Sequence, residues 1–306
     1  MKPQNAGVLI VILSAAGFAT LPVFIKLAYG VGANSITVLT TRFILASLGL
    51  WFILRYRNLS PKVGIKTGIY LGLLGIAGYG LMSAAFAASL NYLSAVMLSL
   101  LFYSYPAIVT LLSFLFGVEE FNWKKGLALV ISFVGLFLIL GVSFADISLT
   151  GIILGMAASI IYATYLLASN HLLKEVDSIV ATTYVCSAAA VTFLLTSVFT
   201  GEFVTTLPIK GWLILLSIAF FSTIVGILGC FIGLSLIGPS NTAIISTAEP
   251  FITVVLSVLL LSEKLTLVQL LGGLLILGSI LLLQLWAGKK QTSPINTAAS
   301  YHSADL

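Results

Sequence analysis

The stretch EPFITVVLSVLLLSEKL (residues 249–265) matches YPAIVTLLSFLFGVEEF (residues 105–121), which stands 144 residues earlier in the chain. Each is an apolar run with a proline as its second residue. At the same shift, GVLIVILSAAGFAT (residues 7–20) matches GIILGMAASIIYAT (residues 151–164). Several matches at one spacing indicate that the chain consists of two homologous halves.

The composition indicates that both halves lie in a membrane. Hydrophobic residues make up 60% of the 306 and charged residues only 8%, and the mean hydropathy is +1.18. A soluble globular domain has about a quarter charged residues, so that class is excluded. The apolar runs are continuous and about 20 residues long, which suits transmembrane helices and not barrel strands. The sequence predicts ten such helices, at residues 6–28, 34–54, 66–88, 94–116, 124–141, 150–170, 178–200, 211–235, 241–261 and 267–287.

The basic residues predict how these helices are oriented. If the N-terminus is cytoplasmic, ten Lys and Arg residues lie in inner segments and three lie near outer helix ends. Cytoplasmic segments carry such an excess, so both termini are expected in the cytoplasm. The inner residues are Lys2, Arg55, Arg57, Lys62, Lys66, Lys124, Lys125, Lys174, Lys289 and Lys290, and the outer ones are Lys26, Lys210 and Lys264.

The predicted fold is an all-α membrane protein with ten transmembrane helices in two inverted five-helix repeats. Residues 6–141 form the first repeat and residues 150–287 the second. Five crossings reverse the direction of the chain, so the second repeat is inverted relative to the first. Inverted repeats around a midplane site are typical of secondary transporters, and duplication in a non-transporting membrane protein is the alternative. The polar tail, residues 288–306, is expected to be disordered and cytoplasmic.

The sequence resembles the EamA domains of the drug/metabolite transporter superfamily. The resemblance extends over about residues 7–287 and rests on TTRFILASLGLWFIL (residues 40–54), AEPFITVVLSVLLLSEKL (residues 248–265) and LVQLLGGLLILGSILLL (residues 267–283). It implies a secondary carrier, from a superfamily that transports amino acids, nucleosides, sugars, cations and drugs. The first half departs from the acid–proline pattern of the second, because Tyr105 stands where the second half has Glu249.

Glu249 is a single deep carboxylate in an apolar helix. An ionised carboxylate in the hydrocarbon layer costs at least ~2.5 kcal/mol, which marks a functional or paired position. Burial favours the neutral form of a carboxyl group, and a group that takes up a proton on one side and releases it on the other couples transport to protons. We therefore predict that Glu249 is a proton-coupling residue. The alternative is a structural role that ties its helix to a neighbour.

Pro106 and Pro250 are predicted to break their helices. A proline has no N–H, so the carbonyl groups of Phe102 and Ser246 lose their helical partners. Within a bilayer, each carbonyl must find a neighbouring group, a hydroxyl or a water molecule.

Polar side chains accompany Glu249 along its helix at a spacing of three or four residues, which places them on one face. Similar stripes occur on helices 94–116 and 150–170. We predict that these faces converge on a substrate-binding site, and the alternative is that the hydroxyls bond to neighbouring helices. The stripes are Thr242, Ser246, Glu249, Thr253 and Ser257; Ser99, Tyr103, Thr110 and Ser113; and Ser159, Tyr162, Tyr165 and Ser169.

Arg42 is the second charge within an apolar run. It lies ~12 Å inside the outer end of its helix, and its Cα differs in depth from that of Glu249 by only ~6 Å. The two side chains are expected either to pair or to hold opposite ends of a zwitterion. The structural alternative is that Arg42 snorkels to the outer head groups or braces a helix end. The predicted substrate-binding residues are Glu249, Arg42, Ser246, Thr242, Thr253, Ser99, Tyr103, Tyr162 and Tyr165.

The predicted function is a secondary transporter that exports small metabolites such as amino acids by alternating access, coupled to protons. The alternatives are an importer or exchanger of a small organic cation, or a channel.

The sequence has no phosphate-binding loop and no clustered catalytic groups, so neither an ATP-driven pump nor an enzyme is expected. Its Cys and His residues lack metal-ligand spacing, so neither a metal nor another cofactor is expected. The expected partners are a small-molecule substrate and the lipid bilayer of the plasma or inner membrane, without nucleic acid, and the chain is expected as a monomer or homodimer.

Overall fold

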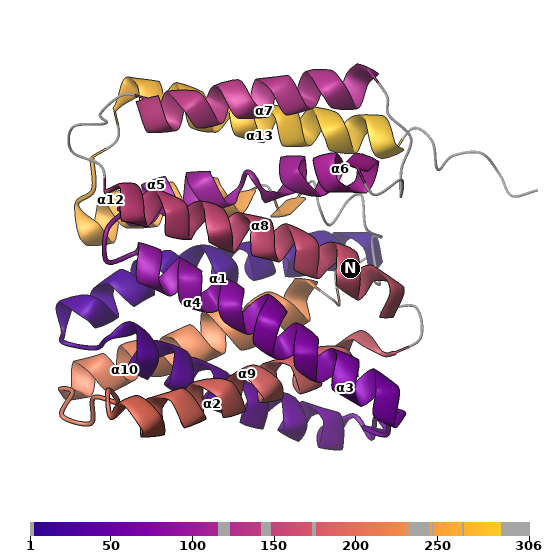
Figure 1. Ribbon diagram of the computed structural model, residues 1–306, viewed down its shortest axis with the longest axis vertical. Helices are drawn as coiled ribbons and strands as arrows, with labels where there is room; N and C mark the ends of the chain where they lie inside the picture. Colours follow the sequence, from indigo (N-terminus) through magenta and orange to yellow (C-terminus); the bar gives the residue numbers. More distant parts are fainter. Residues whose placement is uncertain are drawn as a thin grey trace, which may run out of the picture.

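The structure is a computed structural model that describes residues 3–115, 123–141, 148–172, 176–230, 232, 245–246, 248–264 and 266–288. All regular elements within these residues are helices, and they lie side by side in one bundle (Figure 1). The predicted all-helical class is therefore confirmed. The predicted tail lies outside the described residues beyond Gly288.

The helices of the first half begin and end near the predicted bounds. The third predicted helix is continuous, with π-helical turns in its middle, and the fourth is interrupted at Tyr103 and Ser104. The elements are α1 (Pro3–Gly30), α2 (Ser35–Tyr56), α3 (Ile65–Leu73), η1 (Leu74–Gly80), α4 (Leu81–Ser89), α5 (Ala95–Phe102), α6 (Tyr105–Leu115) and α7 (Trp123–Gly141).

The second half repeats this order. Its helix with π-helical turns is again continuous, and residues 226–230 extend it. The ninth predicted helix is helical at residues 245–246 and from Ala248 onward. The elements are α8 (Leu149–Leu172), α9 (Ser178–Thr200), α10 (Ile209–Ser217), η2 (Ile218–Val225), α12 (Ala248–Leu261) and α13 (Leu267–Gly288).

Side-chain caps define several helix starts. The carboxamide of Asn34 accepts a hydrogen bond from the backbone N–H of Thr37, and the carboxylate of Asp177 caps α9 in the same way. Ser94 caps α5. These residues satisfy N–H groups that have no partner within their own helices. The helix starts are therefore fixed by short polar side chains at the ends of apolar runs.

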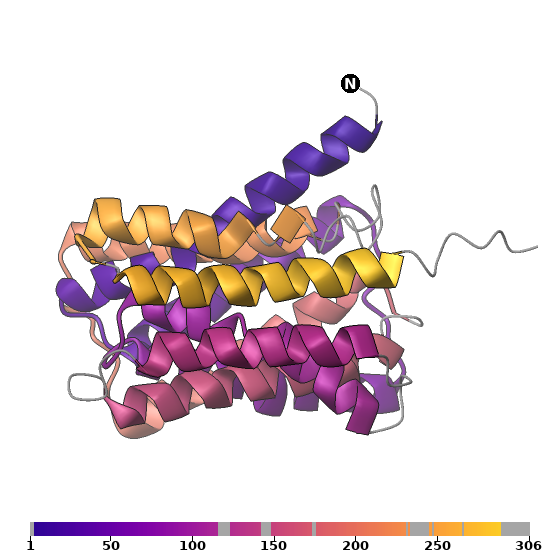
Figure 2. The same ribbon diagram turned by 90° about the horizontal axis from the view of Figure 1, so that it is seen from above.

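Helix packing is symmetric between the two halves: equivalent helices make equivalent contacts. Helix α2 packs on α9, and α7 packs on α13. The second pair lies side by side in Figures 1 and 2. Segment η1 packs on α8 as η2 packs on α1, and α6 packs on α8 as α12 packs on α1. The two halves thus take equivalent places in the bundle.

The two π-helical segments also occur at matching positions. Segment η1 begins at Leu74 and η2 at Ile218, 144 residues apart. A π-helical turn is rare and often lies at a functional site. In η2, the hydroxyl of Thr223 donates to the carbonyl of Ile218 at 3.3 Å, which provides a local partner for that carbonyl. In η1, a Cβ added to Gly75 would lie 2.6 Å from the carbonyl oxygen of Val185, so glycine permits this close approach to α9.

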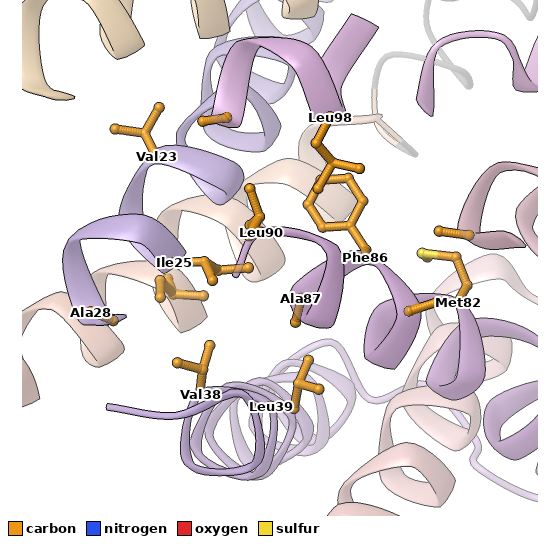
Figure 3. Close-up of a cluster of buried hydrophobic side chains, with 14 of the residues drawn as sticks. Val23, Ile25, Ala28, Val38, Leu39, Met82, Phe86, Ala87, Leu90 and Leu98 are labelled. Atoms are coloured by element: carbon orange, nitrogen blue, oxygen red, sulfur yellow. The ribbon is translucent and has the colours of Figure 1, made fainter. Parts of the chain in front are cut away.

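A hydrophobic core joins helices of the first half. Val23, Val38, Phe86 and Leu98 come from α1, α2, α4 and α5 and gather in one cluster (Figure 3). The same cluster continues into the second half through buried residues such as Leu215. One core therefore holds both halves together.

The outer surface of the bundle is apolar. Phe52 is 71% exposed, Phe199 84% and Leu259 72%. Large apolar side chains exposed to this degree belong against lipid, since water would disfavour them. In the part of the chain that the structure describes, six helical spans are long and apolar enough to cross a membrane, and four shorter apolar helices accompany them. The chain is therefore an integral membrane protein.

Candidate functional site

The break in the fourth span positions the first part of the site. Pro106 stands in the first turn of α6, and the chain turns at Tyr103 and Ser104 just before it. The carbonyl of Phe102 accepts a hydrogen bond of 3.1 Å from the hydroxyl of Ser159 on α8. The hydroxyls of Ser104 and Ser159 are 3.0 Å apart and share a second hydrogen bond. Of the expected partners for the carbonyl of Phe102, the structure provides a hydroxyl, and Ser159 thereby joins α8 to the break before α6.

The turn before α6 places Tyr103 against Glu249. Tyr103 is buried, and its hydroxyl forms a hydrogen bond with the carboxyl group of Glu249 on α12. Glu249 is partly buried, and Pro250 beside it is buried. The Glu249 carboxyl also interacts electrostatically with Tyr105 and with the thiol of Cys230. The acid of the second half is therefore held by a residue of the first half.

Five tyrosines form a continuous group, here called the tyrosine cluster. Its ring centroids are 5.7 Å apart between Tyr79 and Tyr165, and 6.0 Å between Tyr165 and Tyr162. The group continues from Tyr162 to Tyr105 at 4.8 Å and from Tyr105 to Tyr103 at 5.8 Å. Its members come from η1, α8, α6 and the turn between α5 and α6. The predicted residues Tyr103, Tyr162 and Tyr165 are therefore brought together.

Arg42 lies at the other end of the tyrosine cluster. Its Nε donates to the hydroxyl of Thr223 at 2.9 Å, and its Nη2 donates to the hydroxyl of Tyr79 at 3.3 Å. The side chain is only 3% exposed, so the alternative that it snorkels to the head groups is wrong. Its long apolar stem is covered by neighbouring helices, and its charged end points into the protein. Tyr79 bonds to Arg42 and also interacts electrostatically with Glu249.

The remaining predicted residues have different surroundings. The hydroxyl of Thr253 is buried and donates to the carbonyl of Ala19 on α1 at 3.1 Å, which is a contact between helices. Ser99 is buried on α5, and Ser246 is helical and partly buried. Thr242 lies outside the described residues, as do the side chains of Pro106, Thr110 and Ser113.

Two contact residues of Arg42 were missed by the sequence analysis. Tyr79 and Thr223 are polar residues in apolar spans, and each lies in a π-helical segment. They stand 144 residues apart, so they occupy equivalent positions in the two halves. The repeat itself was the signal that would have paired them.

Comparison with known proteins agrees with this architecture. The sequence model of the EamA-like transporter family matches residues 5–141 and again residues 149–285. The uncharacterized transporter YcbK of Bacillus subtilis is 28% identical over 288 residues, which covers 89% of this chain and 90% of that protein. An uncharacterized transporter of Archaeoglobus fulgidus is 26% identical, over 89% of this chain and 94% of its own length.

A solved crystal structure has the same fold. It superposes with a TM-score of 0.65 and 16% sequence identity, covering 94% of this chain and 99% of its own. With the family matched across both halves, the chain belongs to the EamA-like transporter family.

Proposed function

We propose that the protein is a secondary transporter with ten transmembrane helices in two inverted five-helix repeats. It exports small zwitterionic metabolites such as amino acids by alternating access, coupled to protons. The observation that carries this proposal is that Arg42 and Glu249, one from each half, lie at opposite ends of one tyrosine cluster. A basic and an acidic end joined by aromatic groups match the chemistry of a zwitterion.

Each part of the site has a separate role in binding. The guanidinium of Arg42 binds the carboxylate of the substrate, and the carboxylate of Glu249 binds its ammonium group. The tyrosine cluster contacts the apolar part of the substrate through ring faces and edges. Tyrosine faces also attract an ammonium group, which supports binding near Glu249.

Proton coupling follows from the position of Glu249 on the cluster. The ionised carboxyl accepts a hydrogen bond from Tyr103 and holds the substrate ammonium group. A proton that arrives on the opposite side neutralises the carboxyl, removes this attraction and releases the substrate. Each transport cycle therefore exchanges one proton for one substrate cation group at the same carboxyl.

The cellular setting is part of the same proposal. The excess of basic residues at one set of helix ends supports a plasma or inner membrane location with cytoplasmic termini. The chain acts as a monomer or homodimer on a small-molecule substrate in the lipid bilayer, without nucleic acid.

The contact between Tyr103 and Glu249 also supports a second candidate, an importer or exchanger of a small organic cation. An acid surrounded by tyrosines is a suitable receptor for a cation on its own. Arg42 favours the zwitterion, because a buried positive charge beside the same cluster repels a simple cation.

Counterflow in proteoliposomes tests the proposed function. Vesicles loaded with an unlabelled amino acid should take up the same labelled amino acid at a saturable rate, and a proton gradient should drive its accumulation. Protein-free vesicles are the control. Conductance without saturation or counterflow would identify a channel, and counterflow of organic cations alone would identify the second candidate.

A further inference from the structure

We propose that Tyr79 and Thr223 are positioning residues that present one edge of the Arg42 guanidinium to a substrate carboxylate. The proposal rests on the proposed function. It names two residues that would make the site prefer a substrate with a carboxylate. It concerns two hydroxyl groups at equivalent positions of η1 and η2.

The contacts of Arg42 leave a particular edge of the guanidinium open. A guanidinium has donors along a side edge, Nε and Nη2, and along an end edge, Nη1 and Nη2. Thr223 engages Nε, which closes the side edge, and Tyr79 engages one N–H of Nη2. Among the described residues, no further acceptor is seen for the N–H groups of Nη1 or for the second N–H of Nη2. Two parallel hydrogen bonds from this end edge match the two oxygens of a carboxylate.

The burial of Arg42 adds an energetic argument. Its side chain is 3% exposed, and both of its hydrogen-bond partners are uncharged hydroxyls. A buried charge that lacks an opposite charge is strongly disfavoured, and an anion that binds it restores the lost stabilisation. Glu249 is bonded to Tyr103 at the other end of the cluster. Arg42 is therefore prepared for an anion that arrives with the substrate.

Both positioning hydroxyls are themselves held in place. Thr223 donates its proton to the carbonyl of Ile218 at 3.3 Å, so a lone pair of its oxygen faces Arg42. The ring of Tyr79 packs edge-on against Phe43, at 5.8 Å between centroids, and in a tilted arrangement against Tyr165 at 5.7 Å. A receptor that is ordered before binding spends less of its binding energy on ordering itself.

Each half of the chain supplies one of the two hydroxyls that hold Arg42. Tyr79 belongs to the π-helical segment of the first half and Thr223 to that of the second. Arg42 therefore connects the two halves at equivalent points. The orientation of the guanidinium, and with it the binding of a carboxylate at its end edge, therefore depends on both π-helical segments.

Thermal unfolding of the purified protein in detergent tests this inference with acid and amide probes. The probe pairs are L-phenylalanine with L-phenylalaninamide, and benzoate with benzamide. We expect the acids to raise the Tm more than the amides. Tyr79→Phe and Thr223→Val should each weaken apparent affinity for the acids by about 3- to 10-fold, with little change for the amides, because each removes one hydrogen bond that orients the receptor.

Matched controls remove buried hydroxyls elsewhere. Tyr29 donates to the carbonyl of Ala87, and Thr40 donates to the carbonyl of Phe193 on α9. Tyr29→Phe and Thr40→Val should lower the Tm without changing the ratio of acid to amide affinity. Arg42→Lys keeps the charge but not the planar pair of donors, and it should reduce the acid preference by about 10-fold or more.

The outcomes separate the inference from the proposed function. If wild-type protein shows amino acid counterflow but Tyr79→Phe and Thr223→Val keep the wild-type acid-to-amide ratio, the inference is wrong and the transporter stands. If the acid probes bind through Arg42, Tyr79 and Thr223 but counterflow is absent, the inference stands and the proposed function is wrong. If no acid stabilises the wild-type protein more than its amide, the inference is also wrong.

Discussion

The break before α6 and the start of α12 occupy equivalent places in the two halves but carry different chemistry. Both contain a proline, Pro106 in one half and Pro250 in the other. The residue before the proline is Tyr105 in the first half and Glu249 in the second. The two places also meet, because Tyr103 from the first bonds to Glu249 from the second. The backbone plan is therefore duplicated, while the carboxyl group before the proline is present in the second half alone.

The two π-helical segments carry the same kind of chemistry, unlike the two helix breaks. Tyr79 and Thr223 are different residues at equivalent positions, yet both present a hydroxyl to the same guanidinium. Here the two halves contribute the same kind of group to one cation, Arg42. The comparison shows that a symmetric frame surrounds an asymmetric pair of charges.

The largest effect is expected from Glu249→Gln. Glutamine has nearly the size of the protonated acid and can still bond to Tyr103, but it cannot take up or release a proton. Accumulation driven by a proton gradient should be abolished, while some exchange between the two sides remains. The measurement is amino acid uptake in proteoliposomes with and without the gradient, and unchanged dependence on the gradient would make Glu249 a structural group.

A large but smaller loss is expected from Arg42→Gln. A hydrogen bond to a charged group contributes about 1.5–3 kcal/mol, so transport of an amino acid should fall about 10- to 100-fold. Transport of its carboxamide analogue should fall much less, since the analogue has no carboxylate for Arg42 to bind. Equal losses for both substrates, with poor membrane expression, would show that Arg42 supports the fold.

A moderate effect is expected from Pro250→Ala. The substitution restores a backbone N–H that can bond to the carbonyl of Ser246, which stiffens the helix. One added hydrogen bond of about 0.5–1.5 kcal/mol should slow turnover roughly 3- to 10-fold, with substrate affinity almost unchanged. Pro106→Ala is the comparison, and it should have less effect because Ser159 already serves the carbonyl of Phe102. Equal rates in Pro250→Ala and wild-type vesicles would remove the proline from the mechanism.

The smallest effect on transport is expected from Ser159→Ala. The substitution leaves the carbonyl of Phe102 without its hydroxyl partner and removes the contact with Ser104. An unsatisfied buried group costs about 1–3 kcal/mol, so the Tm in detergent should fall while the acid-to-amide ratio stays constant. Ser217→Ala is a matched control, because the hydroxyl of Ser217 is exposed and bonds only to Leu213 in its own helix. Equal Tm changes in the two variants would contradict the role of Ser159.

The sequence predicted those features that follow from local pattern. Continuous apolar runs specify membrane helices, and a proline within such a run specifies the orphan carbonyl that Ser159 satisfies. Tyr103 and Glu249 were both expected at the site, although their hydrogen bond depends on how two distant helices pack. The π-helical turns could not be predicted, since their extra residue is accommodated by tertiary contacts such as that of Gly75 with α9. A polar stripe on one helix does not predict which group each hydroxyl contacts. The hydroxyl of Thr253, for example, bonds to the carbonyl of Ala19 on α1.

The orientation of the two halves tests the central claim most directly. The exposed residues Ser60 and Thr206 lie in equivalent loops, one in each half. Each is changed to cysteine in a chain whose Cys186 and Cys230 are replaced by alanine, and intact cells are treated with a membrane-impermeant maleimide. Inverted halves predict that Thr206→Cys is labelled from outside and Ser60→Cys only after the membrane is opened. Labelling of both positions from the same side would contradict the inverted arrangement, and with it the alternating-access account of the site.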